Sequence, residues 1–147
     1  MRKIYLAGPW FTEKADILER YAYNIYEAVR DKSDCKVFRP RTDGSGEPFD
    51  VFLGNISAIC DSDLVIAQIS EKDVGTAFEI GYARALGKEI ILVGFDKKDF
   101  ERKTNLMLAY AADQCITIDK LYKIFTNEID YSRDVVNAPE YTWENIE

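Results

Sequence analysis

Two carboxylates, Asp73 and Glu79, lie close together in the segment SEKDVGTAFE at positions 70–79. A carboxylate can serve as a nucleophile or as a general acid or base. Because the chain contains no histidine, His-based triads are excluded, and chemistry near neutral pH falls to carboxylates, tyrosine, lysine, serine or cysteine. The segment also has a structural interpretation, since Thr76 and Glu79 have the spacing of a helix capping box. Asp73 would then be a loop carboxylate near the positive end of that helix.

A second group of candidate residues surrounds the first apolar run of the chain, residues 4–7. Tyr5 lies within this run, where a tyrosine is most often part of the core with its hydroxyl satisfied. Gly8, Trp10 and Phe11 follow the run. Their sequence fits neither a dinucleotide fingerprint nor a P-loop, and it lacks the small, hydroxyl-bearing turn that a flavin phosphate requires. The bulky apolar side chains favour a pocket for a flat base instead.

Five short apolar or β-branched runs position these residues and have the character of strands buried in a parallel sheet. They cover residues 4–7, 36–38, 64–67, 90–93 and 115–118. Between and after them, helices are predicted near residues 15–29, 51–59, 76–86, 105–111 and 121–127. This alternation, with right-handed crossovers, predicts an α/β fold with a doubly wound parallel five-stranded sheet. We expect the flavodoxin-like order 2-1-3-4-5, with ligands bound beyond the carboxyl ends of the strands where the strand order reverses.

The length of 147 residues and an apolar share of 47% predict one globular domain over residues 1–147. Segment 41–49 contains two glycines and a proline, which predicts a mobile loop beyond the second strand. Residues 130–147 are polar and weakly periodic. We expect this C-terminal tail to pack on the domain or on a neighbouring subunit.

The composition excludes several classes of partner and cofactor. A net charge of −7 opposes binding to a nucleic-acid backbone, and no apolar run is long enough for a membrane span. The three cysteines are far apart and lack ligand spacing, so we expect small buried hydrophobes, no disulfide and no metal site. The residues that precede the first strand are too few for a signal peptide. We therefore expect a cytoplasmic protein.

Three segments together resemble the nucleoside 2-deoxyribosyltransferase family. They are KIYLAGPWF at residues 3–11, DVGTAFEIGYA at residues 73–83 and NLM at residues 105–107. The resemblance extends over most of the chain, from Lys3 to about Ala111. It implies an enzyme without a cofactor that moves 2-deoxyribose between purine or pyrimidine bases, with deoxynucleosides and free nucleobases as its small-molecule partners.

The resemblance also implies three catalytic roles. Glu79 is the nucleophile, Tyr5 orients it through a hydrogen bond, and Asp73 handles the leaving base and its proton. These roles agree with the chemistry, because cleavage of an N-glycosidic bond builds positive charge at C1′ that a carboxylate can stabilise and then trap. Two such displacements retain the anomeric configuration. The capping-box interpretation of Glu79 loses most of its weight.

Four further roles in substrate binding follow from the resemblance. Trp10 lines the base pocket, and Asn55 falls where some relatives carry an aspartate that contacts the base. An amide can donate as well as accept a hydrogen bond, so base preference is left open. Asn105 and Met107 reach the site of a neighbouring subunit, which implies a homo-oligomer with shared active sites.

Two alternative functions stay open. A 2′-deoxynucleoside 5′-monophosphate N-glycosidase would share the fold and the glutamate but hold a phosphate, for which Lys14, Arg39 and Arg41 are the available cations. The loop after the first strand lacks an anion nest, which disfavours this hydrolase. A non-catalytic nucleoside-sensing module of the same fold is the second alternative, because fold alone does not establish function.

Overall fold

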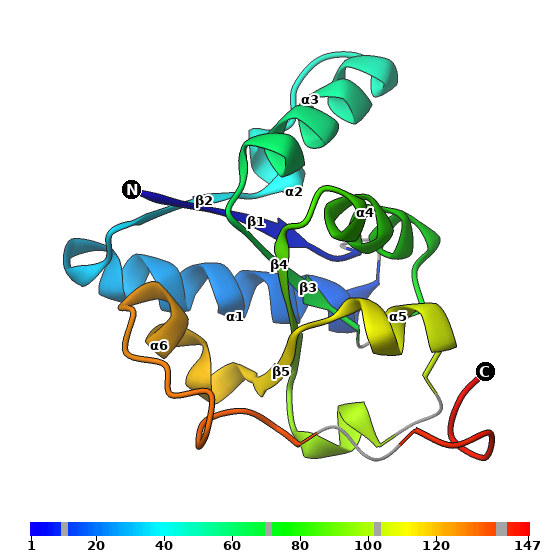
Figure 1. The fold of residues 1–147 in the computed structure, drawn as a ribbon. Coiled ribbons are helices and arrows are strands. Elements are labelled where there is room, and N and C mark those ends of the chain that lie inside the picture. Colours follow the sequence, from blue (N-terminus) through cyan, green and yellow to red (C-terminus); the bar gives the residue numbers. More distant parts are fainter. Residues whose placement is uncertain (10–11, 70–71, 102–103, 138–140) are drawn as a thin grey trace.

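The computed structural model describes residues 1–9, 12–69, 72–101, 104–137 and 141–147. Its centre is a parallel sheet in the order β2-β1-β3-β4-β5 (Figure 1), which confirms the predicted fold class and strand order. The strands are β1 (Arg2–Ala7), β2 (Cys35–Phe38), β3 (Leu64–Gln68), β4 (Glu89–Gly94) and β5 (Gln114–Thr117). Strand β3 lies at the centre and is buried throughout, as expected for an apolar strand covered on both faces.

Helices cover both faces of this sheet (Figure 1). Helices α1 (Glu13–Val29) and α6 (Leu121–Phe125) pack together on one face. The other face carries α3 (Pro48–Asp61), α4 (Val74–Ala85) and α5 (Leu106–Ala111). The remaining short helices are α2 (Pro40–Asp43) and the 3₁₀ turns η1 (Arg30–Lys32), η2 (Lys97–Phe100) and η3 (Ile118–Lys120).

The alternation of side chains along β1 decides which face Tyr5 occupies. Ile4 and Leu6 belong to the core beneath α1 and α6. Tyr5 and Ala7 belong to the core beneath α3 and α4, because successive side chains of a strand point to opposite faces. Tyr5 therefore lies on the same face of the sheet as α4, the helix that carries Glu79.

The segment after β2 differs from its predicted form. We expected a mobile loop over residues 41–49, but α2 begins at Pro40 and α3 begins at Pro48. A proline fits the first position of a helix, where its missing N–H is not needed. Gly46 separates the two helices and has a φ of 98°, a backbone conformation that favours glycine. Much of this segment is therefore helical.

The described parts of the C-terminal tail pack against their own domain. The Val136 amide donates to the Cys115 carbonyl over 2.8 Å, and the Leu106 amide donates to the Glu147 carbonyl over 2.8 Å. The expectation that all three cysteines are buried was wrong for Cys60, which is exposed. Among the described residues, no helix is long and apolar enough to cross a membrane.

Candidate active site

The predicted catalytic residues lie on elements around the point where strand order reverses. Strand β1 pairs with β2 on one side and with β3 on the other. The chain leaves the carboxyl ends of β1 and β3 at Gly8 and Ile69, and the second of these connections leads to Asp73 and α4. Ligand sites of doubly wound sheets lie at this position.

Glu79 is a largely buried carboxylate on α4. Its Oε2 atom is buried and has no hydrogen-bond partner among the described residues. Burial raises the pKa of Glu79 to about 7; the Tyr5 hydroxyl opposes this rise, and the negative charge of Asp73 adds to it. No cation is among the groups that shift this pKa. Desolvation therefore keeps the carboxylate close to protonation at neutral pH.

Tyr5 places its hydroxyl beside this carboxylate. The side chain is fully buried, and its ring stacks on Phe38 with centroids 5.6 Å apart. Burial and the charge of Glu79 raise the pKa of Tyr5, so the phenol stays a proton donor. Its oxygen lies near Glu79 but outside hydrogen-bond geometry.

Asp73 caps α4, and this arrangement corrects the capping-box interpretation. The Oδ2 atom of Asp73 accepts hydrogen bonds from the Thr76 amide at 2.7 Å and from the Thr76 hydroxyl at 2.8 Å. Asp73 is thus the N-cap, and Thr76 lies within the first turn. Glu79 lies in the second turn, beyond the reach of a capping box. Its carboxylate is free for another role.

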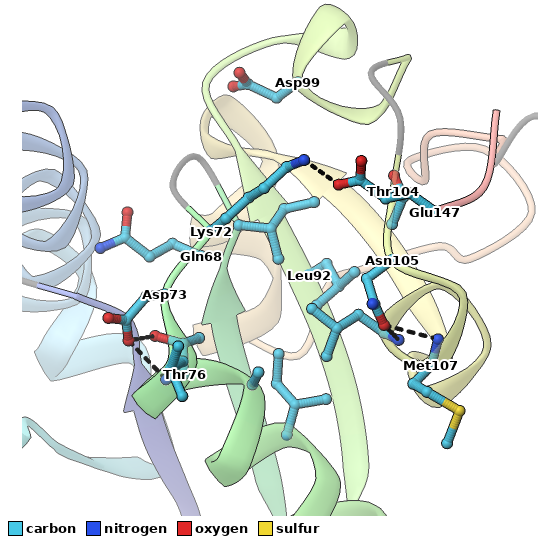
Figure 2. A pocket seen from close by; sticks show the side chains of 15 residues that line it. Gln68, Lys72, Asp73, Thr76, Leu92, Asp99, Thr104, Asn105, Met107 and Glu147 are labelled. Atoms are coloured by element: carbon cyan, nitrogen blue, oxygen red, sulfur yellow. Dashed lines mark hydrogen bonds and ion pairs between the residues drawn. The ribbon is translucent and has the colours of Figure 1, made fainter.

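A pocket of about 810 Å³ opens between α4 and α5 at the carboxyl ends of β3 and β4 (Figure 2). Its lining includes Asp73 on one side and Asn105 and Met107 on the other. Glu79 and Tyr5 do not line it. Within one chain, therefore, Asn105 and Met107 line this pocket and the predicted nucleophile does not.

Asn105 and Met107 lie at the start of α5. The Oδ1 atom of Asn105 accepts hydrogen bonds from the Met107 amide at 2.9 Å and from the Leu108 amide at 3.4 Å. Asn105 is therefore the N-cap of this helix. Its amide nitrogen has no hydrogen-bond partner among the described residues, and Met107 is 73% exposed. Both side chains are accessible to another molecule.

The remaining predicted residues have different surroundings. The Oδ1 atom of Asn55 is buried without a partner among the described residues, on a helix that contacts both β1 and α4. Gly8 lies against Gln68, a buried polar residue that the sequence analysis missed. Its signal in the sequence is a glutamine that ends an apolar run. Trp10 and Phe11 lie outside the described residues.

In the described part of the chain, the site offers neither a metal centre nor free cations at the positions considered for phosphate. No group of three or more metal-ligating side chains occurs among the described residues. The Arg39 guanidinium pairs with Glu19 through two hydrogen bonds of 2.6 and 2.8 Å. Arg41 pairs with Asp16, and Lys14 lies 3.7 Å from a carboxylate oxygen of Asp99. All three cations face a carboxylate.

Fold and site together define a flavodoxin-like α/β domain with a buried carboxylate and a tyrosine near the carboxyl edge of its sheet. The family model of nucleoside 2-deoxyribosyltransferases matches residues 4–107. The chain belongs to this family and is an enzyme of the pentosyltransferase class. This match confirms the resemblance seen in the sequence. No curated protein matches the chain.

Solved structures show the same fold. The 2-deoxyribosyltransferase from Leishmania mexicana is 27% identical, with a TM-score of 0.56 over 93% of this chain and 79% of that chain. The 2-deoxyribosyltransferase from Bacillus psychrosaccharolyticus is 24% identical, with a TM-score of 0.68 over 88% and 93%. A CMP N-glycosidase from Clostridium botulinum is 22% identical, with a TM-score of 0.58 over 86% and 96%.

Proposed function

We propose that this enzyme transfers 2-deoxyribose between nucleobases through a covalent intermediate on Glu79. The observation that carries the proposal is the Glu79 carboxylate, which is buried beside the Tyr5 hydroxyl and has one oxygen without a partner among the described residues. An unpaired buried carboxylate costs stability, and such a group is typical of a reactive site. The family and the relatives named 2-deoxyribosyltransferase support the same reaction.

The first displacement cleaves the donor nucleoside. A Glu79 oxygen attacks C1′ as the C1′–N bond breaks, and the developing cation is trapped as a glycosyl ester. The Tyr5 hydroxyl holds the carboxylate in line for this attack. Asp73 lies close enough to Glu79 to affect its pKa, and we assign to it the transfer of a proton to the leaving base.

The second displacement restores the enzyme. A nitrogen of the acceptor base attacks C1′, the ester bond breaks, and the Glu79 carboxylate is released. The acceptor loses its N–H proton, which returns to Asp73. Because C1′ is inverted twice, its configuration is retained. A hydroxyl at C2′ would withdraw electrons from the cation, so deoxyribose is preferred over ribose.

Chromatography of deoxyinosine or thymidine incubated with free adenine or cytosine tests the transferase directly. Formation of a new deoxynucleoside is the expected result. Free deoxyribose alone would identify a hydrolase, and binding without any product would support the sensing module. An intact-mass adduct formed with a 2-fluoro-substituted deoxynucleoside should map to the peptide that contains Glu79. An adduct on another peptide would contradict the nucleophile assignment.

A 5′-monophosphate N-glycosidase is the second candidate function, and its support is the fold shared with the CMP N-glycosidase. The pairing of Arg39 with Glu19 opposes it, because the carboxylate neutralises the charge of the guanidinium and occupies one of its bidentate edges. Competition between deoxyadenosine and its 5′-monophosphate decides between the two. We expect the nucleoside to win, and preference for the monophosphate would establish the hydrolase.

We further propose a homo-oligomer, at least a dimer, in which Asn105 and Met107 complete a neighbour's site. Within one chain, Glu79 does not line the pocket that contains them, which supports this assembly. A second support is the row of exposed rings on α3 and α4, in which Phe52 lies 6.3 Å from both Phe49 and Phe78. Exposed apolar patches of this kind mark interaction surfaces. We place the reaction in nucleotide salvage in the cytoplasm, since its substrates are free nucleosides and bases.

A further inference from the structure

The first turn of α5 obtains its hydrogen-bond partners from two sources. The first amides of a helix have no partner within the helix itself. The Oδ1 atom of Asn105 accepts from two of them, the Met107 amide at 2.9 Å and the Leu108 amide at 3.4 Å. The Leu106 amide, which precedes both, donates instead to the Glu147 carbonyl over 2.8 Å. The C-terminal segment therefore completes the cap that Asn105 begins.

We call residues 141–147 the C-terminal strap, and its last residues lie beside the segment that leads into α5 (Figure 1). Ile146 forms a parallel bridge with Thr104. The Thr104 amide donates to the Asn145 carbonyl over 3.1 Å, and the Glu147 amide donates to the Thr104 carbonyl over 3.0 Å. The Ile146 side chain is buried. Main-chain bonds from the strap thus hold the chain immediately before and after the helix cap.

Helix α5 is too short to hold its own first turn. It spans only Leu106–Ala111, and helices of this length are unstable without tertiary support. Its buried residue, Ala109, lies beyond the first turn, where the helix packs against α4. The position of the first turn therefore depends on contacts from outside the helix, and the strap supplies them.

An ion pair between Glu147 and Lys72 also joins the strap to the opposite side of the pocket (Figure 2). The two side chains are 40% and 75% exposed. An ion pair this exposed contributes little to stability. The main-chain bonds and the buried Ile146 side chain are therefore the stronger attachment of the strap.

We propose that the strap is a positioning element, anchored by Ile146, that holds Asn105 where the site of the neighbouring subunit requires it. The inference rests on the proposed transferase function and its shared site. Because the cap occupies the Oδ1 atom of Asn105, the amide nitrogen is the part of this side chain that is available to the neighbour. A displaced first turn would move that group, and a misplacement of about 1 Å can lower a rate about 10²-fold.

The Ile146→Asn variant tests the anchor, because it places an amide in a buried apolar position and leaves every proposed site residue in place. The measurement is kcat/KM for hypoxanthine release from deoxyinosine with adenine as acceptor. We expect a fall of about ten- to hundredfold. Ile146→Val should stay close to the wild type because it keeps a branched apolar side chain. Lys72→Gln should do the same, because it removes only the exposed ion pair. A folded Ile146→Asn variant with wild-type kcat/KM would overturn the proposal.

A pair of variants at Leu106 tests the strap from the side of the helix. Leu106→Pro removes the amide that donates to Glu147, while proline fits the first position of a helix. The preceding residue, Asn105, has a φ of −60° and a ψ of 131°, which suits a residue before proline. Leu106→Ala loses the same side chain but keeps the amide. Leu106→Pro should be about two- to tenfold less active than Leu106→Ala, the range of one hydrogen bond. Equal activities of the two folded variants would contradict the proposal.

Complementation shows which subunit's pocket the strap serves. Ile146→Asn co-refolded with Glu79→Ala should regain activity in up to roughly a quarter of the sites, because one pocket of each mixed dimer combines an intact Glu79 with a well-held Asn105. Ile146→Asn co-refolded with Asn105→Ala should gain nothing over Ile146→Asn alone. The opposite pattern, or no gain in either mixture, would show that the strap does not act through the neighbour's site.

The mixture of Glu79→Ala with Asn105→Ala is the reference for these experiments, and native mass spectrometry confirms that mixed dimers form. If the reference regains activity and the mixture of Ile146→Asn with Glu79→Ala does not, the positioning role is wrong while the shared site stands. If the reference itself stays inactive, the shared site has failed, and this inference with it. A wild type that releases no base would overturn the proposed function as a whole.

Discussion

Glu79 combines two requirements that conflict at the level of one residue. A nucleophilic carboxylate must be ionised, yet burial raises its pKa to about 7. Among the described residues, no cation relieves this cost. Desolvation also makes a carboxylate a stronger nucleophile, because water no longer competes for its lone pairs. The sequence identifies the residue, and the surrounding core sets its proton affinity.

The activity should therefore follow the ionisation of Glu79. Because only the carboxylate attacks C1′, we expect kcat/KM to rise about tenfold per pH unit in acid and to level off above a pH of about 7. Glu79→Gln should lower activity by at least about 10³-fold at every pH. Initial rates of base release across pH 5–9 measure both effects. A profile that is flat through this range would contradict the raised pKa.

The same shift predicts a gain in stability for Glu79→Gln. The pKa of Glu79 is higher in the folded state than its ordinary value of 4.5, so folding favours the protonated acid. The stability that the wild type has below pH 4.5 is lost as the pH rises through about 7. The amide does not titrate, so the variant should exceed the wild type by about 1–3 kcal/mol at pH 8. Urea unfolding of both proteins at pH 4.5 and pH 8 measures the difference in their free energies of unfolding. An equal difference at both pH values would show that the ionisation of Glu79 is not its cause.

At the scale of elements, the start of α4 serves the fold and, in the proposed mechanism, also the chemistry. Asp73 satisfies the amide and hydroxyl of Thr76 through one carboxylate oxygen. That cap fixes the first turn of α4. The second turn of the same helix carries Glu79, which lies beside Tyr5 of β1. The capping carboxylate therefore lies within electrostatic reach of the nucleophile. In the proposed mechanism, the residue that anchors the helix also transfers the proton.

Two substitutions of Asp73 should separate these roles. Asparagine caps helices about as well as aspartate, so Asp73→Asn should keep the wild-type melting temperature but lower activity about 10²- to 10⁴-fold, because an amide gives no proton. Asp73→Ala should lose activity and also about 0.5–2 kcal/mol of stability. Thermal unfolding and base-release assays on both variants provide the comparison. Near-normal activity of Asp73→Asn would remove Asp73 from the proton transfer.

At the scale of the whole molecule, one chain separates two groups of residues that we propose to act in the same site. The carboxylate and tyrosine lie between β1 and α4, while Asn105 and Met107 lie across the pocket at the start of α5. Closed two-fold contacts let each subunit complete the site of the other. The exposed rings on α3 and α4 offer apolar surface for such a contact.

Complementation between inactive variants tests the shared site. Glu79→Ala and Asn105→Ala should each be nearly inactive, and a co-refolded mixture should regain activity in up to roughly a quarter of its sites, since a mixed dimer contains one pocket without either defect. The mixture without refolding is the control. Asn105→Asp retains the helix cap but lacks the amide donors, so its loss of activity would not reflect a frayed α5. An inactive mixture in which native mass spectrometry detects mixed dimers would show that sites are not shared.

The sequence by itself determined the order of strands and helices, the family and the segment that carries Glu79. Apolar periodicity indicates which local segments are buried, and short motifs consist of adjacent residues, so both can be recognised in the sequence alone. Only the tertiary structure decided the cap at Asp73, the raised pKa of Glu79 and the bond from Gln68 to Pro9. Each of these depends on packing that the sequence pattern does not encode locally. Proton affinity follows from the apolar volume that several distant elements enclose together, and the Gln68 bond joins residues that become neighbours only when β1 pairs with β3.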